Sequence, residues 1–114
     1  MSETSPYRKE KLAELITHLA SQFIQENSGP QSLRTVTRTD LSSDFKNAKI
    51  FVTVLPDDKE NQALDFLHRN GSEFKDFVKE KSRLQYIPWF DFEIDRGEKS
   101  RQRLDLISEG LKKE

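Results

Sequence analysis

Hydrophobic and polar positions follow two different periods along this chain, and the points where the period changes divide it into elements. From Pro6 to Glu26 apolar residues recur every three or four positions, which predicts a helix with one apolar stripe. The stripe consists of Leu12, Leu15, Ile16, Leu19, Ala20 and Phe23. Such a helix is about 30 Å long at 1.5 Å per residue. Gly29-Pro30 follows its end, as expected for a helix stop.

The stretch from Leu33 to Leu55 changes to the period of a β-strand. Two runs rich in Val, Thr, Ile and Phe flank the polar centre 42–47, which predicts a β-hairpin. In this turn Asp44 is interpreted as a turn-shaping group and not as a catalyst. Alternation in the second run places a set of apolar side chains on one face, predicted to be the core face: Ala48, Ile50, Val52 and Val54.

The first run contains two arginines, and strict alternation of side chains would place both on the same face of the strand. Arg34, Val36 and Arg38 share that face. If helices cover only one side of the sheet, the other side would display Arg34, Arg38, Lys49 and Phe51. This set would form a surface for RNA, although solvated charges on an uncovered face are the simpler interpretation.

Two further helices meet at a predicted bend. The first begins after Pro56-Asp57-Asp58 and ends at Asn70-Gly71-Ser72. Glycine is unfavourable inside a helix by about 1 kcal/mol relative to alanine, and Ser72 is a good N-cap for a second helix from about Glu73 to Lys81. The buried positions predicted for the two helices are Ala63, Phe66, Leu67, Phe74, Phe77 and Val78.

The densest group of cationic residues surrounds this bend. It comprises His68, Arg69, Lys75, Lys79, Lys81 and Arg83. A second group, Arg8, Lys9 and Lys11, lies in the first turns of the first helix, where positive charge is unfavourable by about 0.3 to 1 kcal/mol per group. Two interpretations stay open for the second group, a phosphate contact and three tolerated solvent-facing charges.

A third strand is predicted from Trp89 to Asp95, with Phe90, Phe92 and Ile94 in the core. Trp89 shares a face with Asp91 and Glu93, and acids repel phosphate. A partly covered surface aromatic is therefore a simpler interpretation of Trp89 than a base-stacking platform. Residues 96–114 form a charged C-terminal helix or tail, which divides the chain into a domain over 1–95 and this segment.

Composition narrows the possible functions. The chain has 114 residues, 33% hydrophobic and 34% charged, which suits one modest domain. It has no cysteine, so neither disulfides nor thiolate metal sites can form. With only two histidines, a histidine-based metal site or catalytic triad is not expected. No apolar run approaches the roughly 20 residues of a membrane span, and we expect a soluble cytoplasmic protein. Since the net charge is -1, nucleic-acid binding would rest on a local patch.

The predicted order is helix, strand, strand, helix, bend, helix, strand. It resembles that of a type II KH domain, an α+β RNA-binding fold in which helices cover one face of a three-stranded sheet. The KH bend usually carries a Gly-x-x-Gly loop that grips the nucleic-acid backbone. Here the corresponding residues are Asn70-Gly71-Ser72-Glu73, which lack the second glycine.

Three local motifs resemble those of the ribosome-binding factor A family. Thr35-Val36-Thr37 through Leu41-Ser42-Ser43-Asp44 is similar to the family's first strand and its Ser-Pro-Asp turn, and Ala48 to Val54 to its second strand. Arg83-Leu84-Gln85-Tyr86-Ile87-Pro88, followed by Phe90, Phe92 and Asp95, resembles the family's Arg-Leu-Arg-x-x-Pro-x-Leu-x-Phe segment and closing Asp. The family bend is Ala-x-Gly. This chain departs from the family at five positions, with Asn70 for Ala, Ser72 for Gly, Lys75 for Arg, Ser43 for Pro and Trp89 for Glu.

The resemblance implies a cytoplasmic, non-enzymatic assembly factor, monomeric and without a cofactor or metal. Such a factor binds the small (30S) ribosomal subunit and 16S rRNA during late processing of its precursor, and the family is associated with growth in the cold. The RNA-binding residues expected from it are Arg8, Lys11, Arg38, Lys49, Arg69, Asn70, Gly71, Ser72, Lys75, Lys79 and Arg83. One alternative is a KH-like module for protein-protein contact through the acidic second helix and the charged tail. A small hydrolase using Asp91 and Glu93 is a third interpretation, for which the sequence supplies no pocket.

Overall fold

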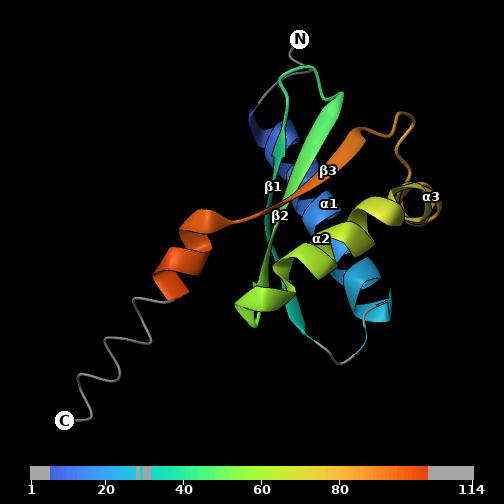
Figure 1. Ribbon diagram of the computed structural model, residues 1–114. Helices are drawn as coiled ribbons and strands as arrows, with labels where there is room; N and C mark the ends of the chain where they lie inside the picture. Colours follow the sequence, from blue (N-terminus) through green and yellow to red (C-terminus); the bar gives the residue numbers. More distant parts are fainter. Residues whose placement is uncertain (1–5, 28, 30–31, 103–114) are drawn as a thin grey trace.

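The computed structural model describes residues 6–27, 29 and 32–102 of the chain (Figure 1). Its elements are α1 (Pro6–Asn27), β1 (Leu33–Leu41), β2 (Asn47–Leu55), the short 3₁₀ turn η1 (Asp57–Lys59), α2 (Glu60–Arg69), α3 (Gly71–Lys81) and β3 (Trp89–Ile94). Residues 96–102 are also helical. This order confirms the predicted α+β succession of helix, hairpin, two helices and strand.

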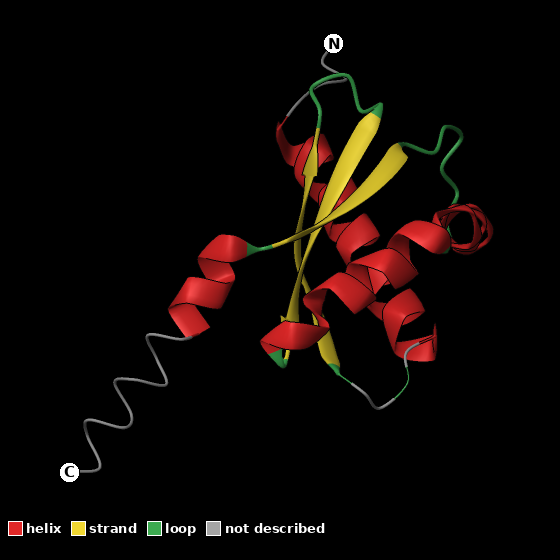
Figure 2. Ribbon diagram, in the orientation of Figure 1, coloured by secondary structure: helices red, strands yellow, loops and turns green. Residues whose placement is uncertain are grey.

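The three strands form one mixed sheet in the order β1-β2-β3. β1 and β2 are antiparallel, with Leu33 opposite Leu55 and Leu41 opposite Ala48. β2 and β3 are parallel, so β3 is an edge strand whose outer side is unpaired. Helices α1, α2 and α3 lie on one side of this sheet (Figure 2), and we call the opposite side the open face.

The core lies between the sheet and the three helices. The predicted core face of β2 is confirmed, because Ala48, Ile50, Val52 and Val54 are all buried. Phe74 of α3 is fully buried, and its ring contacts those of Phe23, Phe90 and Phe92 at centroid distances of 4.8 to 5.7 Å. Phe77 was predicted to be buried but is only half-buried, since it packs at the margin of the core against Phe23.

A β-bulge at Thr37 changes the faces of the first strand. The strand register shifts between Val36 and Arg38, which pair with the consecutive residues Val52 and Phe51. One extra residue in a strand reverses the side on which every later side chain lies. The prediction that Arg34 and Arg38 share a face is therefore wrong.

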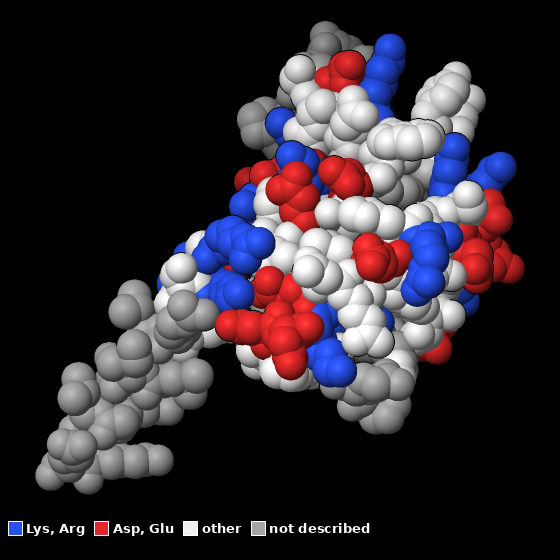
Figure 3. Space-filling model, viewed as in Figure 1, with Lys and Arg blue, Asp and Glu red and all other residues white. Residues whose placement is uncertain are grey.

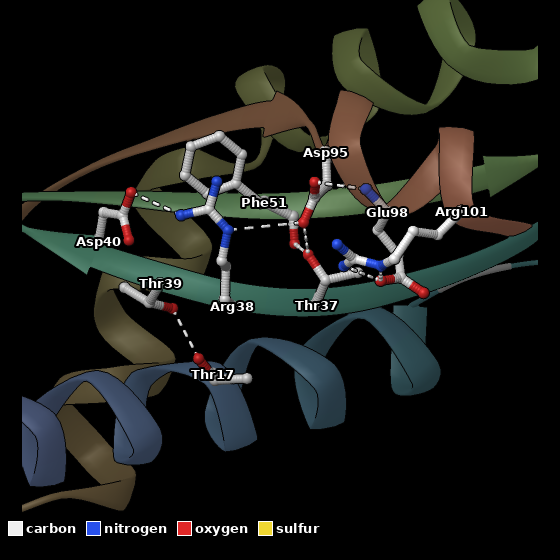
Figure 4. A network of polar contacts seen from close by, with 9 residues as sticks. All are labelled: Thr17, Thr37, Arg38, Thr39, Asp40, Phe51, Asp95, Glu98 and Arg101. Carbon is white, nitrogen blue, oxygen red and sulfur yellow. Dashed lines mark hydrogen bonds and ion pairs between the residues drawn. The ribbon is translucent and has the colours of Figure 1, made fainter.

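Because of the bulge, Arg34 and Arg38 lie on opposite sides of the sheet. Arg34 lies on the helix-covered side, where its guanidinium stands 5.1 Å from the centre of the Phe66 ring. Arg38 lies on the open face, over Phe51. Thr39 is buried on the helix side, with its hydroxyl 2.8 Å from that of Thr17 in α1 (Figure 4).

The hairpin turn is shaped by side-chain oxygens, as predicted for Asp44. Its carboxylate accepts hydrogen bonds from the Ser42 hydroxyl at 2.7 Å and from the Lys46 amide at 3.1 Å. These two bonds, the first in particular, lower the pKa of Asp44. The Ser42 hydroxyl in turn accepts a bond from the Asn47 amide, so one short network closes the turn.

The bend between α2 and α3 is present, but its local chemistry differs from the prediction. α3 begins at Gly71, and Ser72 is its second residue, so Ser72 is not the N-cap. Asn70 separates the helices with φ -101° and ψ 21°. Its side-chain amide donates to the Phe66 carbonyl at 2.7 Å, and its backbone amide donates to the same oxygen at 3.0 Å. Asn70 thus completes the last turn of α2.

The helix over residues 96–102 is attached to the domain at its first turn. Asp95 caps it, since its carboxylate accepts a hydrogen bond from the Glu98 amide at 3.0 Å. Lys99 reaches Glu60 at the start of α2 at 2.6 Å, and both side chains are mostly buried. Residues 103–114, with Leu104, Ile107 and Leu111, lie outside the described residues. The division of the chain at residue 95 stays a prediction.

Candidate nucleic-acid interface

A hollow of about 420 Å³ lies between the bend and the unpaired edge of β3. Leu67 and His68 from the end of α2 and Gly71, Ser72 and Lys75 from the start of α3 form one wall. Residues 88–92 form the other. Residues of α2, α3 and β3 therefore enclose one concave surface, which we call the bend hollow.

Four exposed cationic side chains follow one another from the end of α2, along α3, to the segment after α3. We call them the bend cluster: Arg69, Lys75, Lys79 and Arg83. Within the part of the chain that the structure describes, none of the four forms an ion pair within 4 Å, and only Lys75 lines the hollow. Their charges are available to an external anion.

Helical geometry separates these cations from the acids of the same helix. Lys75 and Lys79 are four residues apart and lie on one stripe of α3. At about 100° per residue, Glu73 and Glu80 lie about 100° or more around the helix axis from both lysines, whereas Asp76 lies about 100° from Lys75 and about 60° from Lys79. The positive stripe is therefore local. In the face of the molecule drawn in Figure 3, Lys and Arg are interspersed with Asp and Glu without a large field of one sign.

The bend residues present backbone as well as side chains to the hollow. The φ angle of Gly71 lies outside the left-handed region, and a Cβ at this position would meet no described atom within 4 Å apart from its chain neighbours and the backbone of its own helix. Neither backbone conformation nor internal packing thus requires a glycine here. Space in front of the Gly71 backbone is left open toward the hollow.

Arg38 and Lys49, two further predicted contacts, lie on the open face among acids. Arg38 binds Asp40 at 2.6 Å and stacks 3.9 Å above the centre of the Phe51 ring. The pKa of Arg38 is raised, and the hydrogen bond to Asp40 is the main cause. Lys49 lies 3.0 Å from Glu93. Both cations are already neutralised within the protein, as the interpretation of solvated strand charges expects.

Asp95 joins the open face to the C-terminal helix (Figure 4). Its carboxylate accepts a hydrogen bond of 2.6 Å from the Thr37 hydroxyl at the bulge and lies 3.6 Å from the Arg38 Nε. Burial alone would raise the pKa of Asp95, but the hydrogen bonds from Thr37 and the Glu98 amide, with Arg38 and Arg101 nearby, hold it below its ordinary value. Arg101 itself pairs with Glu98.

Arg8 and Lys11 lie at a third place. They line a separate hollow of about 930 Å³ between the start of α1, the hairpin turn and residues 84–87. Its floor is apolar, with the half-buried side chains of Leu12, Leu15 and Phe45 among its lining. The predicted RNA-binding residues therefore fall into three groups, and the largest of them has seven residues, from Arg69 before the bend to Arg83 after α3.

Seven of the ten residues that line the bend hollow were not among the predicted contacts. Two of these seven are exposed ring side chains, His68 and Trp89, and Trp89 is 71% exposed. The sequence places each of them correctly on its element, but it does not reveal that β3 and the bend lie side by side. Only the packing of α2 and α3 against the edge of the sheet brings them together.

The two carboxylates considered for catalysis each have a neighbouring side chain. Asp91 and Glu93 share the open face as predicted, with Asp91 3.6 Å from His68 and Glu93 paired to Lys49. No group of three or more metal-ligating side chains is found among the described residues. No helix in the described ranges is both long enough and apolar enough to span a membrane.

Comparison with known proteins gives one consistent result. The family described as ribosome-binding factor A matches residues 8–107. A ribosome-binding factor A of Coprothermobacter proteolyticus is 31% identical over 110 residues, which cover 95% of this chain and 80% of that protein.

Solved structures agree with this match. The crystal structure of ribosome-binding factor A from Thermus thermophilus has a TM-score of 0.70 at 24% identity and covers 77% of this chain and 96% of that one. A homology model of the Thermus thermophilus factor, fitted into a cryo-EM map of its complex with the 30S subunit, has a TM-score of 0.67 at 22% identity, covering 78% and 97% of the two chains. These likenesses support the fold.

Proposed function

Because the chain belongs to the ribosome-binding factor A family, we propose that it binds the small (30S) ribosomal subunit during late maturation and contacts 16S rRNA while its precursor is processed. The observation in the structure that supports this proposal is the bend cluster. Its four exposed cations form no ion pair within 4 Å among the described residues, and one of them, Lys75, lines the hollow at the helix bend of this KH-like fold.

Phosphate groups are the ligands that such a cluster fits. Lysine and arginine bind phosphate oxygens through charge-assisted hydrogen bonds, and these contacts position a protein on RNA without reading its sequence. The chain as a whole carries a net charge of -1, so it has little long-range attraction for arbitrary RNA. Selectivity then comes from the shape of RNA already folded on the subunit.

The protein acts in this proposal by binding and not by catalysis. On the open face Glu93 pairs with Lys49, and Asp91 lies 3.6 Å from His68. The bend hollow is lined mainly by apolar residues, and its titratable groups are His68, Lys75 and Asp91. An assembly factor needs only to occupy its site until the surrounding RNA has matured.

The experiment that tests the proposal measures binding to isolated 30S subunits at several salt concentrations. Each phosphate contact adds roughly 0.7 to 0.9 to the slope of log K against log salt. Replacing both Lys75 and Lys79 by alanine should therefore reduce the magnitude of that slope by about 1.4 to 1.8 and weaken binding, without unfolding the protein.

Lys59→Ala provides a control of similar chemistry. Lys59 lies just before α2, one helix length of about 15 Å from the bend. Its replacement by alanine should leave the slope of log K against log salt unchanged. An unchanged slope for the lysine double variant would show that the bend cluster is not the contact surface. Binding that does not depend on salt at all would favour a packed protein-protein interface, as in the KH-like interaction module.

A further inference from the structure

We propose that the bend hollow holds one unpaired nucleobase, stacked on the indole of Trp89. This inference rests on the proposed function, since it assigns the chemistry of one subsite within the RNA contact.

Trp89 has the exposure and the support that a stacking platform needs. Its side chain is 71% exposed, which is an unfavourable placement for a large apolar group in water unless a partner covers it. Its backbone is fixed, because its amide donates to the Lys46 carbonyl at 2.8 Å and the preceding Pro88 is buried. The ring is thus presented to solvent from a rigid strand.

The acids next to Trp89 oppose phosphate less than the sequence suggests. Asp91 accepts a hydrogen bond from the Phe92 amide at 2.9 Å and lies 3.6 Å from His68. Glu93 lies 3.0 Å from the Lys49 ammonium. Lys75 on the opposite wall of the hollow adds a positive charge on the side where a phosphate would lie.

The edge of β3 supplies polar groups that suit a base edge. The backbone amide of Trp89 donates a hydrogen bond to the Lys46 carbonyl, and that of Asp95 donates one to the Val52 carbonyl, so both amides face β2. Alternation along the strand therefore turns the N–H and C=O groups of Phe90 and Phe92 outward, toward the hollow. Those of Phe92 are engaged by Asp91 and His68, which leaves Phe90 as the residue whose backbone faces a ligand.

The remaining lining fits a flat ring between apolar surfaces. Leu67, Phe90 and Phe92 contribute to the floor, and the uncovered Gly71 backbone faces the same space. Stacking, a donor and an acceptor, and a nearby cation together match an unpaired nucleotide. A base inside a duplex could not enter, because both of its faces are already stacked.

The chain contains a single tryptophan, so its fluorescence reports directly on this site. The experiment adds single-stranded hexanucleotide RNA, or duplex RNA of equal phosphate concentration, to the purified protein. Saturable quenching by the single strand and not by the duplex is expected. Equal quenching by both RNAs, or none by the single strand, would overturn the proposal.

Two variants test the contribution of the Trp89 ring, and the binding of labelled hexanucleotide to each is measured by fluorescence anisotropy. Trp89→Ala should weaken binding about 5- to 140-fold, because stacking on an aromatic ring is worth roughly 1 to 3 kcal/mol per base. Trp89→Phe should lose less. Circular dichroism should show both variants folded, because the side chain is exposed. Wild-type affinity of Trp89→Ala would overturn the proposal.

Binding of the same variants to 30S subunits distinguishes this inference from the proposed function. If the wild-type protein binds subunits but no hexanucleotide quenches Trp89, the base site is refuted and the assembly-factor function stands. If single strands quench Trp89 but subunits are not bound, the base site stands and the proposed function fails.

Discussion

Replacing Asp95 by asparagine tests whether a single carboxylate holds the bulged strand, the end of β3 and the C-terminal helix together. The substitution keeps the size of the side chain and its ability to cap a helix but removes its charge. Asp95 is 5% exposed and accepts hydrogen bonds from the Thr37 hydroxyl and the Glu98 amide.

The expected loss of stability follows from these two bonds. A hydrogen bond to a charged group contributes about 1.5 to 3 kcal/mol, against about 0.5 to 1.5 kcal/mol for a neutral one. Weakening two such bonds without breaking them should lower the free energy of unfolding by about 1 to 2 kcal/mol. Asp95→Ala also removes the helix cap, worth about 1 kcal/mol, and should lose about 2 to 4 kcal/mol.

The pH dependence of this difference has a definite sign. The pKa of Asp95 is lower in the folded protein than in the unfolded chain, where an aspartate titrates near 3.9. The stability supplied by the ionised carboxylate is therefore fully present above that value and is lost as the pH falls through the lower, folded-state pKa. The gap between the wild type and Asp95→Asn should be constant from about pH 7 to 5 and shrink below about pH 4.

Urea unfolding of both proteins at pH 7, 5, 4 and 3.5 measures this gap. Thr37→Val, alone and combined with Asp95→Asn, gives a double-mutant cycle in which the pair should show a coupling energy of about 1 kcal/mol. A gap that persists undiminished to pH 3.5, or equal stabilities at pH 7, would refute the assigned role of the charge.

Three further predictions concern the core, the bend and the C-terminal helix. Phe74→Ala should lower the free energy of unfolding by about 3 to 5 kcal/mol because the ring is fully buried, whereas half-buried Phe77→Ala should lose distinctly less; equal losses in urea unfolding would contradict this placement. Gly71→Ala should leave stability unchanged or raise it by about 0.4 to 1 kcal/mol, since its Cβ meets nothing, yet weaken RNA binding by narrowing the hollow; a lower melting temperature would refute the first part. Lys99→Ala should speed hydrogen exchange of the amides in residues 96–102 without changing that of β2, because the Lys99–Glu60 pair attaches this helix; unchanged exchange would show that the pair is dispensable.

Periodicity predicted most of the fold because the elements are long and their apolar spacing is regular. It failed at the bulge, where one residue, Thr37, reverses the face of the rest of β1. A signal for this was present in the sequence. Val36 and Leu41 are both apolar but five residues apart, and they can lie on one face of a strand only if an extra residue intervenes.

The candidate site was predicted less completely than the fold. The cationic bend was visible in the sequence because its residues are neighbours along the chain. Trp89 belongs to a different element, and its neighbours in the chain are acids, so local sequence argued against an RNA contact. The ion pair of Glu93 with Lys49 of β2 and the position of His68 of α2 3.6 Å from Asp91 weaken that argument, and both depend on tertiary structure alone.

Similarly, Arg38 and Lys49 carried the right charge for phosphate, but sequence gave no means of assigning their partners. Arg38 is held between Asp40 and Asp95, and Lys49 is held by Glu93. Whether RNA can compete with these pairs stays a prediction.

Co-sedimentation of the purified protein with isolated 30S subunits, with whole ribosomes and with free RNA, each at a low and a moderate salt concentration, tests the central claim most directly. The proposed function predicts that the protein pellets with free small subunits, that moderate salt releases it, and that whole ribosomes do not retain it. Absence from every ribosomal fraction at low salt would contradict the claim that this chain is an assembly factor of the small subunit.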